Sequence, residues 1–233
     1  MNDPVAIITG AGRGIGNATA IELNRRGFAV VLVSRSEPEL AQTAKACRTA
    51  LVVCADVTVQ ADVDRIVAES LGKFGRIDAL VNNAGYAPML SVEATSPDEF
   101  RKVLEVNLTA AFTLSRKCWP TFVKQSAGVI VNVSSMAAKD PLRGFAAYGA
   151  AKAGLNILGL TMAREGAPHG IRVHTIAPGS VETKMFRALV DEKTWPREKT
   201  LAPADVAAMI AGCVTGELKY TSGEVIYIRR EPA

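Results

Sequence analysis

The chain has 233 residues, of which 48% are hydrophobic and 21% charged, and its formal net charge is +4. This length and composition are those of one globular domain, so we expect a single domain over residues 1–233. The mild charge lacks the clustered basic footprint of a nucleic-acid binder, and no apolar run approaches the about 18 residues of a membrane span. We therefore expect no nucleic-acid partner and no membrane contact.

Short apolar runs alternate with longer helical patterns along the chain. The apolar runs predict strands over residues 5–9, 29–34, 50–55, 77–85, 128–135, 171–179 and 224–228. The intervening patterns predict helices near 15–26, 37–47, 59–73, 97–124, 148–166 and 203–213. Runs of Val, Ile and Leu without polar alternation are typical of strands buried on both faces. The alternation indicates a single-domain doubly wound (Rossmann) α/β fold, with a mostly parallel seven-stranded sheet and helices on both faces.

Residues 180–202 interrupt this alternation after the sixth strand. A long connection in such a fold is usually either a lid or a disordered segment. Met185, Phe186 and Trp195 make the segment apolar enough to cover a hydrophobic substrate. Packing without substrate contact explains these side chains equally well, but we expect a variable substrate lid here.

Four cysteines are scattered through the sequence, at Cys47, Cys54, Cys118 and Cys213. No pair has metal-ligand spacing, so we expect no metal site. The first ten residues also lack the basic and apolar regions of a signal peptide. Reduced thiols and the missing signal together predict a cytoplasmic location.

A glycine-rich turn follows the first predicted strand. Gly10, Gly14 and Gly16, with Ile15 between the last two, have the spacing G-x-x-x-G-x-G at the start of the first predicted helix. Because glycine has no side chain, its backbone amides can approach a pyrophosphate closely. The N-terminus of a helix then offers N–H donors and a partial positive charge to that anion. A tight structural turn would look similar, but the position after strand one predicts a dinucleotide diphosphate site.

These glycines and several later motifs, taken together, resemble the short-chain dehydrogenase/reductase family. The motifs are Thr9-Gly10-x-x-x-Gly14-x-Gly16, "NNAG" at 82–85, Asn107, "NVSS" at 132–135, Tyr148-x-x-x-Lys152 and Pro178-Gly179. The resemblance extends from about residue 4 to 228 and is to the single-domain branch, similar to 3-oxoacyl-acyl-carrier-protein reductases. It implies an oxidoreductase that uses a nicotinamide dinucleotide.

The second predicted strand ends with Ser34 and Arg35, where NAD-binding folds commonly carry an acid for the ribose hydroxyls. Arginine attracts a 2′-phosphate that an acid would repel. Arg13 offers a second cation, and in the family a basic residue at either place accompanies NADP preference. We therefore predict NADP(H) as cofactor, although both arginines could instead be solvated surface residues.

The resemblance implies further cofactor contacts after the later strands. Asp56 and Val57 correspond to the adenine site, although Asp56 could instead cap the next helix. Asn83, Ala84 and Gly85 correspond to the floor beneath the cofactor, whereas Asn82 could be a clamp between strands. The family residues that reach the nicotinamide and the diphosphate correspond to Pro178, Gly179, Val181 and Thr183, for which the alternative is an ordinary Pro-Gly turn.

Tyr148 and Lys152 are the predicted proton-transfer pair. Residues at i and i+4 share one helix face, about 5–6 Å apart at Cβ. A charge about 5 Å away is worth ~3 kcal/mol at an effective dielectric near 20, which would lower a phenol pKa by roughly two units. We therefore expect a phenol that exchanges protons near neutral pH. In the family this pair also contacts the cofactor.

Two further polar residues complete the catalytic set that the resemblance implies. Ser135 corresponds to the serine that holds the substrate carbonyl, with Ser134 as the competing candidate. Asn107 corresponds to the asparagine that holds a water between solvent and the lysine, and asparagine is otherwise a mildly poor helix former.

We predict an NADP(H)-dependent oxidoreductase that transfers hydride between nicotinamide and a small-molecule carbonyl or secondary alcohol. Reduction of 3-oxoacyl thioesters is the most familiar family activity. The alternatives are a non-catalytic dinucleotide-binding regulator, which needs no proton relay, and an epimerase or dehydratase, which usually has a longer chain. Long helices near 97–124 and 148–166 favour a homodimer or homotetramer, but Arg229 and Arg230 replace the family's Gly-rich end and leave the tetramer contacts open.

Overall fold

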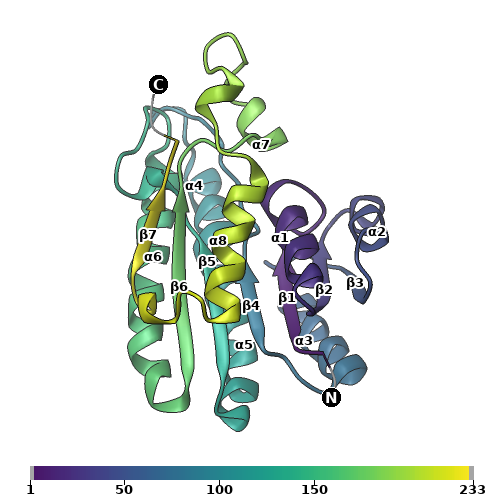
Figure 1. Cartoon of the computed structure of the whole chain (residues 1–233). Helices are drawn as coiled ribbons and strands as arrows, with labels where there is room; N and C mark the ends of the chain where they lie inside the picture. The colour runs from purple at the N-terminus through teal and green to yellow at the C-terminus, as the bar shows by residue number, and fades with distance from the viewer. Residues whose placement is uncertain (1–2, 231–233) are drawn as a thin grey trace.

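The computed structural model describes residues 3–230, which form one seven-stranded parallel sheet (Figure 1). Its strands are β1 Val5–Thr9, β2 Ala29–Ser34, β3 Ala50–Cys54, β4 Ala79–Asn82, β5 Gly128–Val133, β6 Ile171–Pro178 and β7 Val225–Ile228. The strand order is β3-β2-β1-β4-β5-β6-β7. The order reverses between β1 and β4, so the carboxyl ends of these strands flank the crevice in which doubly wound sheets bind ligands. The predicted fold class is confirmed.

Helices cover both faces of the sheet. The α-helices of the described residues are α1 Gly14–Arg25, α2 Glu37–Lys45, α3 Gln60–Phe74, α4 Pro97–Leu104, α5 Ala110–Gln125, α6 Ala146–Gly166, α7 Lys184–Arg187 and α8 Pro203–Thr215. Helices α1, α2 and α8 pack on one face, and α3, α5 and α6 on the other. Short α7 stands beyond the carboxyl ends of the strands (Figure 1).

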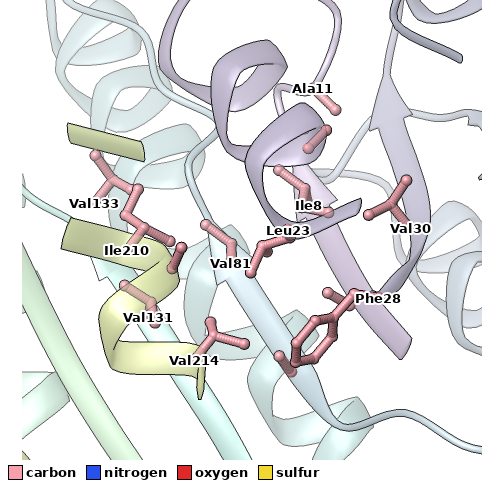
Figure 2. Packing of buried hydrophobic residues seen from close by; sticks show 14 of the residues in the cluster. Ile8, Ala11, Leu23, Phe28, Val30, Val81, Val131, Val133, Ile210 and Val214 are labelled. Atoms are coloured by element: carbon pink, nitrogen blue, oxygen red, sulfur yellow. The ribbon is translucent and has the colours of Figure 1, made fainter. Parts of the chain in front are cut away.

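The two faces are built by alternate residues of the same strands. Ile8 and Val30 point into the cluster that α1 and α8 cover, together with Leu23 and Ile210 (Figure 2). Ile7, the neighbour of Ile8, points into the opposite cluster. Both faces are fully apolar because successive strand side chains point to opposite sides and both sides are buried.

The single helix predicted over 97–124 is two helices joined by a π-helical turn, Glu105–Thr109. A π turn inserts one extra residue into the helical repeat and often marks a functional position. It contains the buried Asn107. The prediction of one continuous helix was therefore wrong at the position that carries the candidate site residue.

Two strands end two or more residues earlier than predicted. The strand predicted over 77–85 spans only Ala79–Asn82, and the strand predicted over 128–135 ends at Val133. The chain leaves the sheet at Asn83 because its backbone N–H bonds the Thr9 hydroxyl instead of a strand. Residues 83–85 and 134–135 consequently belong to the crevice and not to the sheet.

The segment 180–202 is folded, so the alternative of a disordered connection is wrong. A parallel bridge joins Val181 to Leu201, and the segment contains α7 and a 3₁₀ turn, Arg197–Lys199. The two ends of the segment are thus paired with each other next to the carboxyl end of β6.

Within residues 3–230, no helix is both long and apolar enough to cross a membrane. No group of three or more His, Cys, Asp or Glu side chains in the same range could hold a metal ion.

Candidate active site

The glycine-rich turn lies at the carboxyl end of β1, where α1 begins. Gly10 and Gly14 have φ values of +65° and +56°, a region that favours glycine. A Cβ on Gly16 would lie 2.2 Å from the Gly10 carbonyl oxygen, so no side chain fits there. The side chain of Ile15 packs against the hydrophobic core, so only its backbone contributes to the turn.

The N-terminus of α1 carries the donors that a diphosphate requires. Its N-cap residue, Arg13, makes no side-chain hydrogen bond to the first-turn N–H groups. The first N–H groups of a helix have no partner within the helix, and with the helix dipole they favour an anion. The donor set of this turn therefore fits the diphosphate of a dinucleotide.

Thr9 ties the loop after β4 to this turn. Its Oγ1 accepts hydrogen bonds from the backbone N–H groups of Asn83 and Ala84, both at 2.9 Å. The Asn83 side chain donates to the Thr9 carbonyl oxygen at 2.8 Å. Asn82 is buried and donates to Asn132 Oδ1 at 2.9 Å, so it clamps β4 to β5. Both the backbone and the Asn83 side chain of this loop are thus tied to the end of β1.

The two arginines predicted to select the cofactor both meet carboxylates. Arg35 Nη1 lies 3.6 Å from Asp56 Oδ2, and Arg13 Nη1 lies 3.3 Å from Glu39 Oε1. Burial acts to raise the pKa of Asp56, but hydrogen bonds from Thr58 and the charge of Arg35 together lower it. Asp56 is therefore ionised at neutral pH.

Asp56 also shapes the turn that precedes α3. Its Oδ1 accepts from the Thr58 N–H at 3.0 Å and from the Thr58 hydroxyl at 2.7 Å. It does not cap α3 directly, because the N-cap of that helix is Val59. Val57, next to it, lines a small hollow together with Thr9 and Ala84.

Tyr148 and Lys152 lie on α6, with the Lys152 ammonium 5.6 Å from the centre of the Tyr148 ring. The lysine is only 3% exposed and donates to the Val133 carbonyl oxygen at 2.8 Å. Burial lowers the pKa of Lys152 to about 8, so the side chain is still mainly an ammonium at pH 7. Tyr148 and Lys152 therefore lie close together, and the lysine carries its positive charge at neutral pH.

The predicted lowering of the phenol pKa is not found. Burial raises the pKa of Tyr148, and the hydrogen bond with Ser135 opposes this only in part. The prediction from sequence considered the attraction of the ammonium but omitted the loss of water around the phenolate. Tyr148 is therefore a protonated phenol at neutral pH in this structure.

The two candidate serines after β5 face different partners. Ser135 is the N-cap of a 3₁₀ turn, and its Oγ accepts from the Ala137 N–H at 3.1 Å as well as pairing with Tyr148. Ser134 is buried, and its hydroxyl donates to the Lys152 carbonyl oxygen at 3.3 Å. Of the two serines, only Ser135 acts on the phenol, whose pKa its side chain lowers.

Asn107 holds the loop that follows β4. Its Nδ2 donates to the Tyr86 carbonyl oxygen at 2.7 Å, and its Oδ1 accepts from the Tyr86 N–H at 3.2 Å. A Cβ on Gly85 would lie 3.1 Å from Asn107 Oδ1 and 3.9 Å from Lys152 Nζ. Gly85 thus lies between the asparagine and the lysine, and a side chain there would crowd the Asn107 amide. Sequence reasoning had not identified Tyr86 as the partner of Asn107.

The chain after β6 turns toward the glycine-rich turn. Pro178 ends β6, and the Gly179 N–H donates to the Ile228 carbonyl oxygen at 2.8 Å. Thr183 caps α7 by accepting from the Phe186 N–H at 3.2 Å. A Cβ on Gly14 would lie 3.2 Å from Thr183 Cγ2, so the start of the 180–202 segment rests against the turn.

One hollow lies apart from these residues. Its volume is about 340 Å³, and it is found where α4 and α6 begin. Its lining comprises Val92, Thr95, Pro97, Phe100, Arg101, Ala146 and Ala147. It contains none of the predicted catalytic or cofactor residues, so we assign the candidate site to the carboxyl edge of the sheet.

Comparison with known proteins identifies the family. Residues 4–194 match the family model described as short chain dehydrogenase. The chain belongs to the short-chain dehydrogenase/reductase family. As a member, it is an oxidoreductase of a group that binds nicotinamide dinucleotides.

Several short-chain dehydrogenase/reductases are similar over nearly the whole chain. The 3-oxoacyl-[acyl-carrier-protein] reductase of Vibrio cholerae is 34% identical, over 98% of this chain and 96% of its own. A short-chain reductase of Streptomyces niveus is 34% identical, over 97% and 92%. Among solved structures, the 3-ketoacyl-(acyl-carrier-protein) reductase of Brucella melitensis in complex with NADH has a TM-score of 0.92 and 32% identity, covering 97% of this chain and 96% of that chain.

Proposed function

We propose that this protein is an NADP(H)-dependent reductase that transfers hydride between nicotinamide and a carbonyl carbon or secondary alcohol. The observation that carries the proposal is the meeting of Tyr148, Ser135 and Lys152 beside the loop after β4, which Thr9 ties to the glycine-rich turn. We further propose that residues 1–233 act as one catalytic unit with 180–202 as its lid. The four cysteines, all free, support a reducing compartment such as the cytoplasm.

The proposed mechanism divides the reduction between cofactor and protein. When bound, the cofactor supplies the hydride that the carbonyl carbon receives. The Ser135 hydroxyl holds the carbonyl oxygen, and the Tyr148 hydroxyl donates the proton to that oxygen. Because burial keeps Tyr148 protonated at neutral pH, its resting form is the one that reduction requires.

Lys152 and Asn107 support the phenol in this proposal. The Lys152 ammonium, 5.6 Å from the ring centre, stabilises the phenolate that remains after proton donation. Asn107 fixes the Tyr86 backbone beside Gly85, next to the lysine, where we place the water of the proton path. The proton lost by Tyr148 is replaced through this lysine.

The cofactor preference rests on this chain's own cations. Arg13 and Arg35 lie on the two loops that flank the proposed adenosine ribose, and each is at least 60% exposed. Their guanidinium groups are therefore accessible from solvent to a 2′-phosphate, although each is paired with a carboxylate. The Brucella relative was solved with NADH, so the family likeness leaves this preference to be measured.

The proposed substrates are ketones with an apolar substituent, including 3-oxoacyl thioesters. Four apolar side chains, on three segments that adjoin predicted site residues, are exposed by 39% or more: Met89, Leu142, Met185 and Trp195. The Leu90 N–H donates to the Gly144 carbonyl oxygen at 3.0 Å, which joins two of these loops. The Vibrio and Brucella relatives are both reductases of 3-oxoacyl carrier substrates by name, which supports the thioester class.

We also propose a homodimer or homotetramer. Phe112 on α5 and Ile157 on α6 are 47% and 64% exposed, and large apolar side chains at the surface are typical of an interface. The faces of these helices would be covered by the same helices of a second copy.

A direct assay tests the catalytic proposal. Oxidation of NADPH is followed by absorbance with a panel of ketones, 3-oxoacyl thioesters and quinones. Turnover of at least one class is expected. NADPH binding without turnover of any member would instead favour the non-catalytic regulator.

A further inference from the structure

A cluster of three charged side chains spans the mouth of the proposed cofactor site. We call Arg13, Glu39 and Lys184 the mouth cluster. Glu39 Oε1 lies 3.3 Å from Arg13 Nη1 and 3.9 Å from Lys184 Nζ. The three residues come from the cap of α1, the first turn of α2 and the first residue of α7, so a single carboxylate links the cofactor turn to the lid segment.

Glu39 reaches this place because Gly12 leaves room for it. A Cβ on Gly12 would lie 2.9 Å from Glu39 Cβ, 3.2 Å from Glu39 Oε2 and 3.3 Å from Ser34 Oγ. The carboxylate therefore lies between the glycine-rich turn and the end of β2. This is the position where the proposed function places the 2′-phosphate of the cofactor.

Two roles are open to a carboxylate at this position. It could accept hydrogen bonds from the ribose hydroxyls of NAD, as an acid after strand two commonly does. It could instead be the counterion of the cations that bind a 2′-phosphate. A phosphate and an ionised carboxylate repel each other at close range, so the two roles predict opposite cofactor preferences.

The contacts of Glu39 favour the counterion role. Both of its charged partners are cations, and the third cation, Arg35, has its own carboxylate partner in Asp56 at 3.6 Å. Each pair is longer than the 2.7–2.9 Å of a strong charge-assisted hydrogen bond. Arg13 and Lys184 are 60% and 79% exposed, so these pairs are weak and exchangeable.

We propose that Glu39 is a specificity-determining counterion that Arg13 and Lys184 release when they bind the 2′-phosphate of NADP(H). Lys184 then binds the phosphate from the lid segment, which couples lid position to the phosphorylated cofactor. This inference rests on the proposed NADP(H) preference and adds two residues to it.

Calorimetric titration with 2′-phospho-ADP-ribose and with ADP-ribose tests the proposal, since the two ligands differ only in the 2′-phosphate. Glu39→Gln is expected to tighten binding of the phosphorylated ligand by about 3- to 10-fold, and Lys184→Gln to weaken it by a similar factor, as for partly exposed charge pairs. Binding of ADP-ribose should change less than about twofold in both variants. Glu37→Gln, which removes the same charge from the same helical turn, is the matched control.

A second measurement reports on the mobility of the lid segment, residues 180–202. Amide hydrogen exchange in residues 184–190 should slow with 2′-phospho-ADP-ribose but not with ADP-ribose, and Lys184→Gln should abolish the difference. Weaker ADP-ribose binding by Glu39→Gln would make Glu39 a ribose ligand and overturn the proposal, as would an unchanged ligand ratio in both variants. If the unsubstituted protein itself does not prefer the phosphorylated ligand, the NADP(H) assignment fails. A preference that both variants retain defeats only the role of the mouth cluster.

Discussion

The buried ammonium of Lys152 should make the native protein less stable at neutral pH than a variant without that charge. The substitution is Lys152→Met, which has similar length and no ionisable group. Burial lowers the pKa of Lys152 from 10.5 to about 8, a shift of about 2.5 units. At ~1.4 kcal/mol per unit, the folded state loses about 3.5 kcal/mol at any pH at which this group is charged in both the folded and the unfolded chain.

The direction in which stability changes with pH follows from the number of protons that each state binds. Because the folded pKa is the lower one, the unfolded chain binds more protons between pH 8 and 10.5, and stability rises with pH across that window. Below pH 8 the full destabilisation is present. Lys152→Met also removes the hydrogen bond to the Val133 carbonyl oxygen, worth about 1–1.5 kcal/mol. The net expectation is a variant more stable by about 2 kcal/mol at pH 7.

Urea unfolding of both proteins from pH 7 to 10.5 measures this difference. The advantage of Lys152→Met should shrink as pH rises through 8 and reverse near pH 10.5, where only the lost hydrogen bond remains. Lys45→Met, at an exposed position of α2, controls for the general effect of replacing a lysine and should show no such trend. A destabilised Lys152→Met at pH 7, or a difference that does not vary with pH, would refute the burial argument.

Three further substitutions test the cofactor turn, the cofactor preference and the assembly. Gly16→Ala places a Cβ 2.2 Å from the Gly10 carbonyl oxygen. It should lower the free energy of unfolding in urea by about 1–3 kcal/mol and abolish NADPH binding. The control Gly72→Ala, in open space on α3, should do neither. A Gly16→Ala protein with unchanged stability and affinity would contradict the tight turn. Arg35→Asp should lower the NADPH-to-NADH ratio of kcat/KM by about tenfold or more, because it replaces attraction by repulsion; an unchanged ratio would remove Arg35 from the site. Ile157→Asp should shift the mass measured by light scattering from oligomer to monomer, and a retained oligomer would place the interface elsewhere.

The sequence was sufficient to predict the fold and the proximity of Tyr148 and Lys152. Strand ranges such as 5–9 and 29–34 agree with the structure because continuous apolar runs have one stable environment, a sheet covered on both faces. Tyr148 and Lys152 share a helix face because four residues make about one turn. Their proximity follows from local periodicity alone.

Other features depend on tertiary contacts that no local pattern encodes. The π turn at Glu105–Thr109 was missed because a helix that contains an extra residue has the same composition as one without it. The approach of Glu39 to Arg13 joins residues 26 positions apart and requires the space at Gly12. The direction of the Tyr148 pKa shift depends on burial, which spacing in the sequence does not report.

The central claim is that Tyr148 donates the proton that completes carbonyl reduction. Tyr148→Phe removes the hydroxyl and keeps the ring, so cofactor binding and turnover can be measured separately on one folded protein. We expect NADPH to bind with an affinity within a few-fold of the original, by fluorescence titration, while NADPH oxidation with any substrate found in the panel falls by at least about 100-fold. Retained turnover in Tyr148→Phe would contradict the account.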